Sequence, residues 1–355
     1  MTADLPLNTS MNGCSHHPLS PFAQPFLIGG VCIPNRVVLA PMAGLTISAY
    51  RRHLRLHGVG LVTTEMVSAY GLVYGNVRTV EYLDFAEEER PLAVQLFGDS
   101  PDIMAQAAER VLSRDRVADV LDINMGCPVR KVVRTGAGSA LLGDHDRAVA
   151  VAMAVVRMAA PFGVPVTVKL RSGLRAGETG GVVDLARRLE EVGVAAVGLH
   201  PRTADQFYRG EADHTITAKV VEGLGIPVVA SGDIRSHVSA RTVLERTGAT
   251  AVMLARGAAG DPWSVGALLS GMDTPRPALD VVIADLRALL TRVAEERGSQ
   301  RAARWSRKLL GWYLRPSGVP AFLIEKLRRL PDVDALDRAL AEIADGMADG
   351  RLGSH

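Results

Sequence analysis

The alternation of short apolar runs with helix-like stretches constrains the fold of this chain more than any other feature of its sequence. Stretches such as "GGVVDLARRLEEVG" and "SHVSARTVLERTG" separate the runs, and several end in or near Gly, as helices do. The apolar runs are Val37–Ala40, Leu61–Glu65, Leu92–Leu96, Val120–Asn124, Val166–Leu170, Ala195–His200, Pro227–Ala230 and Ala251–Leu254. Runs of this length are typical of parallel strands that are buried on both faces. The pattern predicts an α/β chain folded as a (β/α)8 TIM barrel.

A doubly wound sheet is the alternative fold for such an alternation. Its dinucleotide site needs the pattern Gly-x-Gly-x-x-Gly directly after the first strand. The nearest match is Gly136-Ala137-Gly138, which lacks the third Gly and follows the fourth apolar run. The sequence therefore favours the barrel, which we place over residues 25–270.

The two ends of the chain lack this alternation. Residues 1–24 are rich in Ser, Pro, Asn and His without periodicity, which predicts a mobile N-terminal tail. Residues 278–347 contain only helical patterns, which are punctuated by prolines. We therefore expect a small C-terminal helical domain after the barrel.

Composition limits the classes of function that the chain can have. Its net charge is only +2, so any surface for nucleic acid must be local. The cysteines, which are Cys14, Cys32 and Cys127, are too few for a disulfide framework or a metal cage. The apolar run Ala148–Val156 is much shorter than the roughly 18 residues of a membrane span, and the N-terminus lacks a signal-peptide pattern. We expect a soluble cytoplasmic protein and predict no metal, membrane or protein partner.

Polar side chains follow most of the apolar runs, where a barrel enzyme carries its functional residues. They are Glu65, Gln95, Asn124, Cys127, Lys169, Arg171, His200, Arg202 and Thr203. The seventh and eighth runs lead into Ser231-Gly232-Asp233 and Ala255-Arg256-Gly257. The loops after these two strands form the usual phosphate site of a barrel. Their small residues therefore predict a phosphorylated cofactor or substrate.

Lys169 has three interpretations. It forms a Schiff base in an aldolase, pairs with an anion, or simply reaches solvent. A Schiff-base lysine needs an apolar setting that lowers its pKa. The neighbouring strand ends carry Arg171 and His200, which favour an anion-binding cleft.

Cys127 has two interpretations. A free cysteine is most often a buried filler. Here it stands between Gly126 and Pro128, and it is followed by the cations Arg130, Lys131 and Arg134. A loop thiol in such surroundings is a candidate acid or nucleophile.

The predicted helical domain carries a local excess of positive charge. Residues 301–330 contain eight Lys or Arg and one Glu, for a net charge of +7, with Trp305, Trp312 and Tyr313 among them. Residues 331–355 have a net charge of −4, so one interpretation is a helix face that the acidic end balances. Clustered cations with interleaved aromatics also fit an RNA-binding surface.

The order and content of several motifs resemble the tRNA dihydrouridine synthases, and most closely their bacterial B-type subfamily. The motifs are "APMAG", "TEM", "QLFG", "DINMGCPVRKVVRTGAGSALL", "VKLR", "HPRT", "ASGDI" and "MLARGAAGDPW". The resemblance covers residues 26–320, and the Asn-x-Gly-Cys-Pro segment is its most specific part. It includes "RWSRKLLGWYL", which is similar to the family's tRNA-binding helix.

The resemblance implies a barrel that contains FMN and uses NADPH to reduce the C5–C6 double bond of uridines in tRNA. It implies that Cys127 is the general acid and that His200 supports the flavin or its phosphate. The residues implied to line the flavin ring are Pro41, Met42 and Ala43, and those at its polar edge are Gln95 and Lys169. The residues implied to hold the phosphate are Ser231, Gly232, Asp233, Ala255 and Arg256.

The resemblance also implies residues that face the tRNA. Asn124 is expected at the uracil edge, and cations are expected at the phosphates or at the loop that carries the cysteine. These cations are Arg130, Lys131, Arg134, Arg202, Arg304, Arg307 and Lys308. The chain departs from the family at three places, because Pro201, Ser231 and Ala255 replace the common Gly, Asn and Gly. Pro201 removes a backbone donor from the sixth loop and fixes φ there.

Three other functions compete with this one. An FMN-dependent dehydrogenase of a free pyrimidine, of the dihydroorotate or dihydropyrimidine type, shares the chemistry but needs no basic helical domain. A lysine-dependent aldolase shares the fold but contains no flavin. A tRNA-binding chaperone with a vestigial site would have no need of an intact Cys127 and Lys169.

Overall fold

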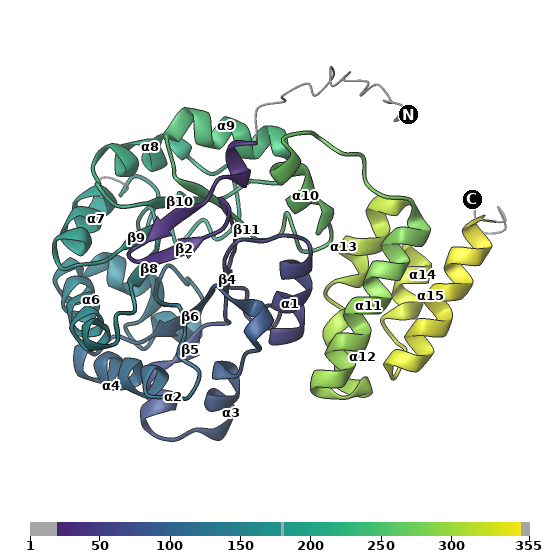
Figure 1. Cartoon of the computed structure of the whole chain (residues 1–355), viewed down its shortest axis with the longest axis horizontal. Helices are drawn as coiled ribbons and strands as arrows, with labels where there is room; N and C mark the ends of the chain where they lie inside the picture. Colours follow the sequence, from purple (N-terminus) through teal and green to yellow (C-terminus); the bar gives the residue numbers. More distant parts are fainter. Residues whose placement is uncertain (1–19, 179–180, 349–355) are drawn as a thin grey trace, which may run out of the picture.

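The computed structural model describes residues 20–178 and 181–348 and contains a nearly closed barrel of parallel strands (Figure 1). The strands are β3 (Val37–Leu39), β4 (Val62–Thr63), β6 (Leu92–Phe97), β7 (Val120–Met125), β8 (Val166–Arg171), β9 (Ala196–His200), β10 (Val228–Ser231) and β11 (Ala251–Leu254). Their order is β3-β11-β10-β9-β8-β7-β6-β4, and a bridge between Val38 and Leu61 brings β3 beside β4. The predicted (β/α)8 barrel is therefore confirmed.

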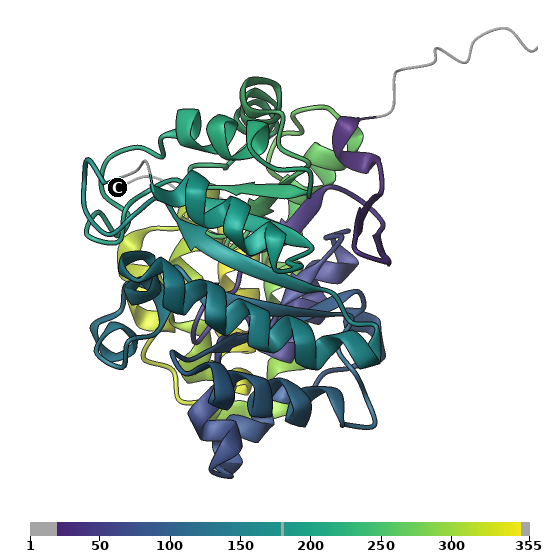
Figure 2. The same ribbon diagram turned by 90° about the vertical axis from the view of Figure 1, so that its left-hand side faces the viewer.

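Helices on the outside of the barrel cover its strands (Figure 2). They are α1 (Ser48–Leu56), α4 (Pro101–Leu112), α6 (His145–Ala159), α7 (Gly181–Glu191), α8 (His214–Glu222), α9 (His237–Thr247) and α10 (Trp263–Ser270). Local sequence sets several of their ends. The side chains of Ser100 and Asp144 accept hydrogen bonds from the first turns of α4 and α6, and Gly248 ends α9 in the left-handed conformation.

A hairpin of β1 (Phe26–Ile28) and β2 (Val31–Ile33) precedes the barrel, and the sequence patterns did not predict it. Its buried side chains pack with the inward-facing residues of the strands in one apolar cluster. A short 3-10 helix, Pro21–Ala23, comes before the hairpin, and Phe22 in it is fully buried. The Ser20 hydroxyl donates a hydrogen bond to the carbonyl of Leu268. The predicted tail of residues 1–24 is therefore wrong from Ser20 onward, and residues 1–19 lie outside the described residues.

Short elements fill the loops at the C-terminal ends of the strands. After β4 come β5 (Val67–Ser68), α2 (Ala69–Val73), α3 (Val77–Val80) and the 3-10 turns Glu81–Leu83 and Glu87–Glu89. After β7 come α5 (Arg130–Val133) and the 3-10 segment Gly138–Gly143. The 3-10 turn Ala160–Phe162, in contrast, follows α6 and precedes the start of β8. The sequence analysis missed the insertion after β4, because it has no long apolar period.

The C-terminal region is entirely helical in the part that the structure describes, and it lies beside the barrel (Figure 1). Its elements are α11 (Leu279–Arg297), α12 (Ser299–Ser306), α13 (Leu310–Leu314), the 3-10 turn Arg315–Ser317, α14 (Ala321–Leu327) and α15 (Val333–Ala348). Asp285 of α11 accepts hydrogen bonds from His53 of α1 at 3.0 Å, from His57 directly after α1 at 2.9 Å, and from the Tyr313 hydroxyl at 3.2 Å. These buried polar contacts fix the helical region against α1. None of the described helices is long and apolar enough to cross a membrane.

Candidate active site

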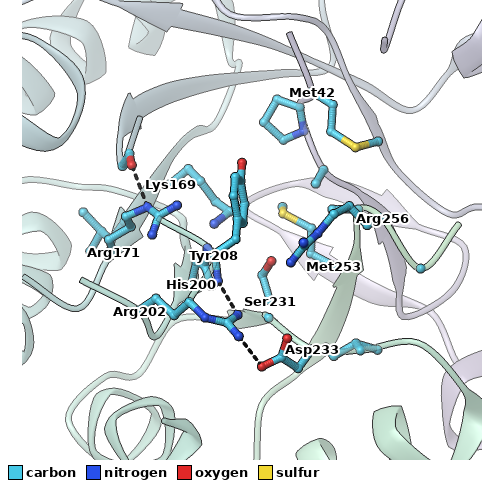
Figure 3. Close-up of a pocket in the computed structure, with 18 of the residues that line it drawn as sticks. Met42, Lys169, Arg171, His200, Arg202, Tyr208, Ser231, Asp233, Met253 and Arg256 are labelled. Atoms are coloured by element: carbon cyan, nitrogen blue, oxygen red, sulfur yellow. Dashed lines mark hydrogen bonds and ion pairs between the residues drawn. The ribbon is translucent and has the colours of Figure 1, made fainter. Parts of the chain in front are cut away.

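One pocket at the C-terminal ends of the strands brings together most of the residues that the sequence predicted for a site (Figure 3). Of the predicted residues, those that line it are Pro41, Met42, Asn124, Cys127, Lys169, His200, Arg202, Ser231, Gly232, Asp233, Ala255 and Arg256. They come from six different strands or the loops after them, which only the closed barrel makes neighbours.

Two residues predicted to contact a cofactor do not line this pocket. Ala43 is exposed in the loop after β3. Gln95 is fully buried, where its amide donates to Asp122 at 2.6 Å and accepts from Asn124 at 2.8 Å. Both ends of its amide are thus bonded to the protein. Gln95 therefore fixes the side chain of Asn124 through a hydrogen bond, and it does not line the pocket.

The loop that carries Cys127 is held from two sides. The Asn124 side-chain oxygen accepts the backbone N–H groups of Gly126 and Cys127, at 3.2 and 2.9 Å. Arg171 donates from Nε to the carbonyl of Gly126 at 3.0 Å. Burial raises the pKa of the Cys127 thiol, although nearby Arg171 opposes the shift. The thiol is therefore protonated at neutral pH, as a proton donor must be and a thiolate nucleophile is not.

Lys169 is a half-buried lysine in the wall of the pocket, with no carboxylate partner within ion-pair distance in the described structure. Burial and the neighbouring Arg171 lower its pKa to about 7, and Asp122 opposes this shift. The lysine chain passes directly over Gly198 on β9, where an added Cβ would lie 2.7 Å from Cδ of Lys169. Gly198 is thus needed for the lysine to reach the pocket. An anion in the pocket would restore the charge of Lys169.

Tyr208 stands in the pocket, and the sequence analysis did not single it out (Figure 3). Its ring lies 4.6 Å from the guanidinium carbon of Arg256 and 5.7 Å from that of Arg171. The side chain is 57% exposed, so part of it is accessible to a ligand. The available signal was an aromatic residue in a loop rich in charged residues, because such a loop has little apolar core in which to bury the ring.

Arg202 lines the pocket, but its guanidinium group is hydrogen-bonded to other parts of the protein. It is 2% exposed, and it donates to Asp233 at 2.6 Å and to the carbonyl of Gly210 at 2.6 Å. It also donates to Nε2 of His200 at 3.3 Å, so that nitrogen must be an acceptor. Burial and the surrounding cations lower the pKa of His200 far below its usual range, which keeps the ring neutral. Arg202 therefore orients His200 and Asp233 at the wall of the pocket, and its contact with tRNA stays a prediction.

Replacing Arg202 with Met is expected to lower the free energy of unfolding by about 1–3 kcal/mol, because it removes a hydrogen-bond donor from Asp233 and from the Gly210 carbonyl. Arg209→Met, in the same loop but exposed, is the matched control and is expected to change stability little. Urea unfolding of the two variants measures the difference. Equal stabilities would show that the Arg202–Asp233 pair does not hold this loop.

The loops after β10 and β11 leave their backbone open to the pocket. Gly232 has φ of 114°, a conformation that other residues rarely adopt, and an added Cβ would meet Ala212 at 2.8 Å. A Cβ at Gly257 would collide with the carbonyl of Ile234. The Asp233 carboxylate accepts from Arg202 and from the Ala212 N–H, so it braces the loop. The backbone of these loops, not the Asp233 side chain, is thus the surface suited to a phosphate.

The cations predicted to meet RNA lie in two places. Arg130, Lys131 and Arg134 are exposed on and after α5, and none has an ion pair within the described residues. Arg304 and Arg307 are exposed on and after α12. Lys308 donates instead to the carbonyl of Gly44 at 3.1 Å, so it ties the helical region to the loop after β3.

Comparison with protein families gives one match over most of the chain. The family described as dihydrouridine synthase (Dus) matches residues 38–338. The chain is 36% identical to "tRNA-dihydrouridine synthase B" of Xanthomonas axonopodis pv. citri, with 91% of this chain and 99% of that protein covered. It is 37% identical to "Probable tRNA-dihydrouridine synthase 1" of Synechocystis sp., with 90% of each covered.

Solved structures with a similar fold are more distant in sequence. The old yellow enzyme homologue from Zymomonas mobilis has a TM-score of 0.55 at 13% identity, covering 73% of this chain and 95% of that one. The old yellow enzyme from Trypanosoma cruzi has a TM-score of 0.56 at 10% identity, covering 78% of this chain and 97% of that one. At these identities the likeness concerns the barrel fold.

Proposed function

Because this chain belongs to the dihydrouridine synthase family, we propose that it reduces the C5–C6 double bond of uridines in tRNA, with FMN as cofactor and NADPH as reductant. One observation supports the proposal independently of family membership. A protonated thiol, an unpaired lysine and two backbone loops suited to a phosphate line the same pocket. This set supplies a proton, a counter-charge and an anchor for a phosphorylated cofactor.

The residues of the pocket fit FMN. The backbone of residues 231–234 and 255–257 would hold its phosphate, helped by the Arg256 side chain. Pro41 and Met42 offer an apolar surface for the ring, and Lys169 would face its polar edge. When bound, FMN supplies the hydride that adds to C6 of the uracil. The positive charge of Lys169 would stabilise the negative charge of the reduced ring.

Cys127 completes the reduction by giving a proton to C5. Because its pKa is raised, the thiol stays protonated until C5 of the uracil accepts the proton. Asn124 and Arg171 hold the loop, and so they set where the thiol stands. Tyr208, which has the guanidinium groups of Arg171 and Arg256 near its ring, would contact the base.

A lysine-dependent aldolase is the competing function that one observation favours. Burial lowers the pKa of Lys169 to about 7, and a Schiff-base lysine needs such a shift. Arg171 contributes to this shift, and a cation next to the lysine also suits an anionic cofactor. The two functions predict different purified proteins, since the aldolase would be colourless.

The proposed activity is tested with purified protein and unmodified tRNA. We expect an FMN absorption spectrum, bleaching by NADPH, and re-oxidation by tRNA with dihydrouridine detected by mass spectrometry of nucleosides. A parallel titration with NADH measures the preference between the two reductants. A colourless protein that forms a borohydride-trapped adduct at Lys169 would support the aldolase instead.

The exposed cations of α12 are expected to contact tRNA phosphates. Reversing Arg304 and Arg307 to Glu should weaken tRNA binding and lower the slope of log affinity against log salt by about 0.9 per lost contact. The control reverses Arg157 and Arg246, exposed cations on α6 and α9 that make no ion pair within the described residues. Both double variants change the net charge equally. Identical salt slopes in the two variants would move the RNA-binding surface away from α12.

A further inference from the structure

Two histidines and one aspartate converge where α1 of the barrel packs against α11 of the helical region (Figure 1). His53 lies on α1, His57 follows it directly, and Asp285 lies on α11. The ligand atoms of the three side chains all lie within 4.8 Å of one another. We call these residues the His-His-Asp cluster. None of them lines the active-site pocket, so the proposed reaction gives the cluster no role.

The spacing of the two histidines places their rings side by side. Residues four apart are neighbours on the surface of a helix, and the ring centroids of His53 and His57 are 5.1 Å apart. Both rings present Nε2 to the same carboxylate. Nε2 of His53 lies 3.0 Å from Oδ2 of Asp285, and Nε2 of His57 lies 2.9 Å from Oδ1. Two histidines at this spacing on one helix face are a recurrent pair of zinc ligands.

The distances within the cluster suit one shared metal ion. Zinc is usually tetrahedral and binds nitrogen or carboxylate oxygen at about 2.0–2.2 Å, so two ligand atoms on one ion stand roughly 3.3 Å apart. The two N···O distances, 3.0 and 2.9 Å, are only slightly shorter than this. Small side-chain rotations would therefore admit an ion between the ligands. Two histidines and one carboxylate form a ligand set that zinc and other divalent transition metals use, with further positions open to water.

Asp285 is a mostly buried carboxylate whose charge is not balanced by Lys or Arg. Burial raises the pKa of its carboxyl group, but hydrogen bonds from His53 and His57 outweigh this effect and hold the pKa well below its usual range. Within the part of the chain that the structure describes, its ion-pair partners are these two imidazoles. Buried charges in proteins are paired or coordinate metals. The charge of Asp285 is therefore balanced either by a proton on an imidazole or by a metal cation.

The surroundings orient the cluster and leave a path to it. The hydroxyl of the fully buried Tyr313 donates to Oδ2 of Asp285 at 3.2 Å. Carboxylates that bind metals are usually hydrogen-bonded by a second residue in this way. Trp263 packs edge-on against the ring of His57, with the centroids 5.9 Å apart. His57 and Asp285 are 16% and 15% exposed, so an ion can reach the cluster from solvent.

We propose that the His-His-Asp cluster binds one divalent transition-metal ion of the zinc class. Its ligands are Nε2 of His53, Nε2 of His57 and the carboxylate of Asp285. The ion would join α1 to α11 and thereby stabilise the joint between the barrel and the helical region. The proposal differs from the sequence-based expectation of no metal, which was based on the cysteines. Asp285 is 228 residues from His57, so the sequence did not reveal the third ligand.

Binding is measured on the full-length protein after chelation and dialysis, with Co²⁺ as the probe. We expect one Co²⁺ per chain by elemental analysis and visible absorption bands that Zn²⁺ abolishes by displacement. Tyr313→Phe should weaken binding about 10- to 100-fold, the usual effect of losing a group that orients a ligand. His57→Gln and Asp285→Asn remove ligands and should weaken it by more than about 100-fold. His145→Gln, at a histidine that begins α6, is the control and should bind as the wild type does.

Thermal unfolding provides a second measurement on the same proteins. Zn²⁺ should raise the Tm of the wild type in a concentration-dependent manner, because it binds the folded state, and it should leave the Tm of His57→Gln unchanged. If Asp285→Asn does not fold, His57→Gln at the end of α1 provides the same comparison.

Three results would overturn the proposal. Absence of Co²⁺ binding by the wild type, or equal binding by the wild type and His57→Gln, would leave the cluster as a hydrogen-bonded joint whose charge a proton balances. An intense near-ultraviolet band from thiolate–cobalt bonding would place the ion on a cysteine instead. All of these measurements are made without tRNA, so they are independent of the proposed function. Failure of that function would appear separately, as a lack of dihydrouridine formation.

Discussion

Cys127→Ala is expected to yield a yellow protein that NADPH still bleaches but that forms dihydrouridine roughly 10²–10⁴-fold more slowly. The loss follows from removing the proton donor to C5, since hydride delivery does not need the thiol. The loop should survive the change, because Asn124 and Arg171 hold its backbone and neither contacts the Cys127 side chain through a hydrogen bond in this structure. The measurement is rapid mixing of pre-reduced enzyme with unmodified tRNA, followed by mass spectrometry of nucleosides.

Cys32→Ala is the matched control, because Cys32 is an exposed free cysteine on β2. It should have no effect on either half-reaction. A wild-type rate in Cys127→Ala would make this cysteine a filler, and the acid would then lie elsewhere in the pocket. Loss of flavin from the variant would show a structural role instead.

The pH dependence provides a second check on the same residue. Because burial raises the pKa of the Cys127 thiol, the thiol stays protonated through neutral pH. The rate of flavin oxidation by tRNA should therefore be flat at neutral pH and fall only above the ordinary range of a cysteine. The Cys127→Ala variant should lack this alkaline fall. A rate that already falls below neutral pH would point to another acid.

Lys169→Met is expected to slow reduction of the flavin by NADPH roughly 10²–10³-fold, the usual cost of removing one preorganised electrostatic partner. Methionine is unbranched and only one atom shorter, so it can follow the same path over Gly198, but it lacks the charge that would stabilise the reduced ring. The flavin midpoint potential should become more negative. Lys219→Met, at an exposed lysine of α8, is the control.

The same variant should become more stable in the absence of flavin. The folded protein lowers the pKa of Lys169 from 10.5 to about 7, so between these pH values the unfolded state binds more protons. The free energy of unfolding of the wild type should therefore rise with pH across this window, with its full penalty present below about pH 7. Lys169→Met should remove that rise. Urea unfolding of flavin-free protein at several pH values measures it, and parallel pH curves would contradict the assignment.

Local pattern was enough to predict the barrel strands. Val120–Asn124 was predicted as a strand and β7 is Val120–Met125, and Ala251–Leu254 was predicted as the strand that the structure contains. Continuous apolar runs identify strands that are buried on both faces, and the runs were regular enough to imply closure. The ends of these strands then gave the positions of Cys127 and Lys169 in one pocket.

Local pattern was not enough where partners come from distant parts of the chain. Arg202 donates hydrogen bonds to Asp233 and to two backbone carbonyls of its own loop. The residues around Arg202 in the sequence do not predict these contacts. Likewise, the Gln95 side chain is hydrogen-bonded to Asp122 and Asn124 of the next strand, and it does not line the pocket. A cation or an amide looks the same in sequence whether it faces solvent or a buried acceptor.

The sequence by itself determined the barrel, the order of its strands and which residues stand at the strand ends, because these depend on the period and composition of short segments. The tertiary structure alone decided which side chains at those ends face the pocket and which brace its walls. Tyr208 lines the pocket, and Lys308 connects the helical region to Gly44 through a hydrogen bond. Arg78 and Arg301, which are far apart in sequence, line the same groove between the barrel and the helical region. The reason is physical: the energy of a polar side chain depends on partners within a few ångströms in space, and only closure of the barrel and docking of the helices bring those partners together.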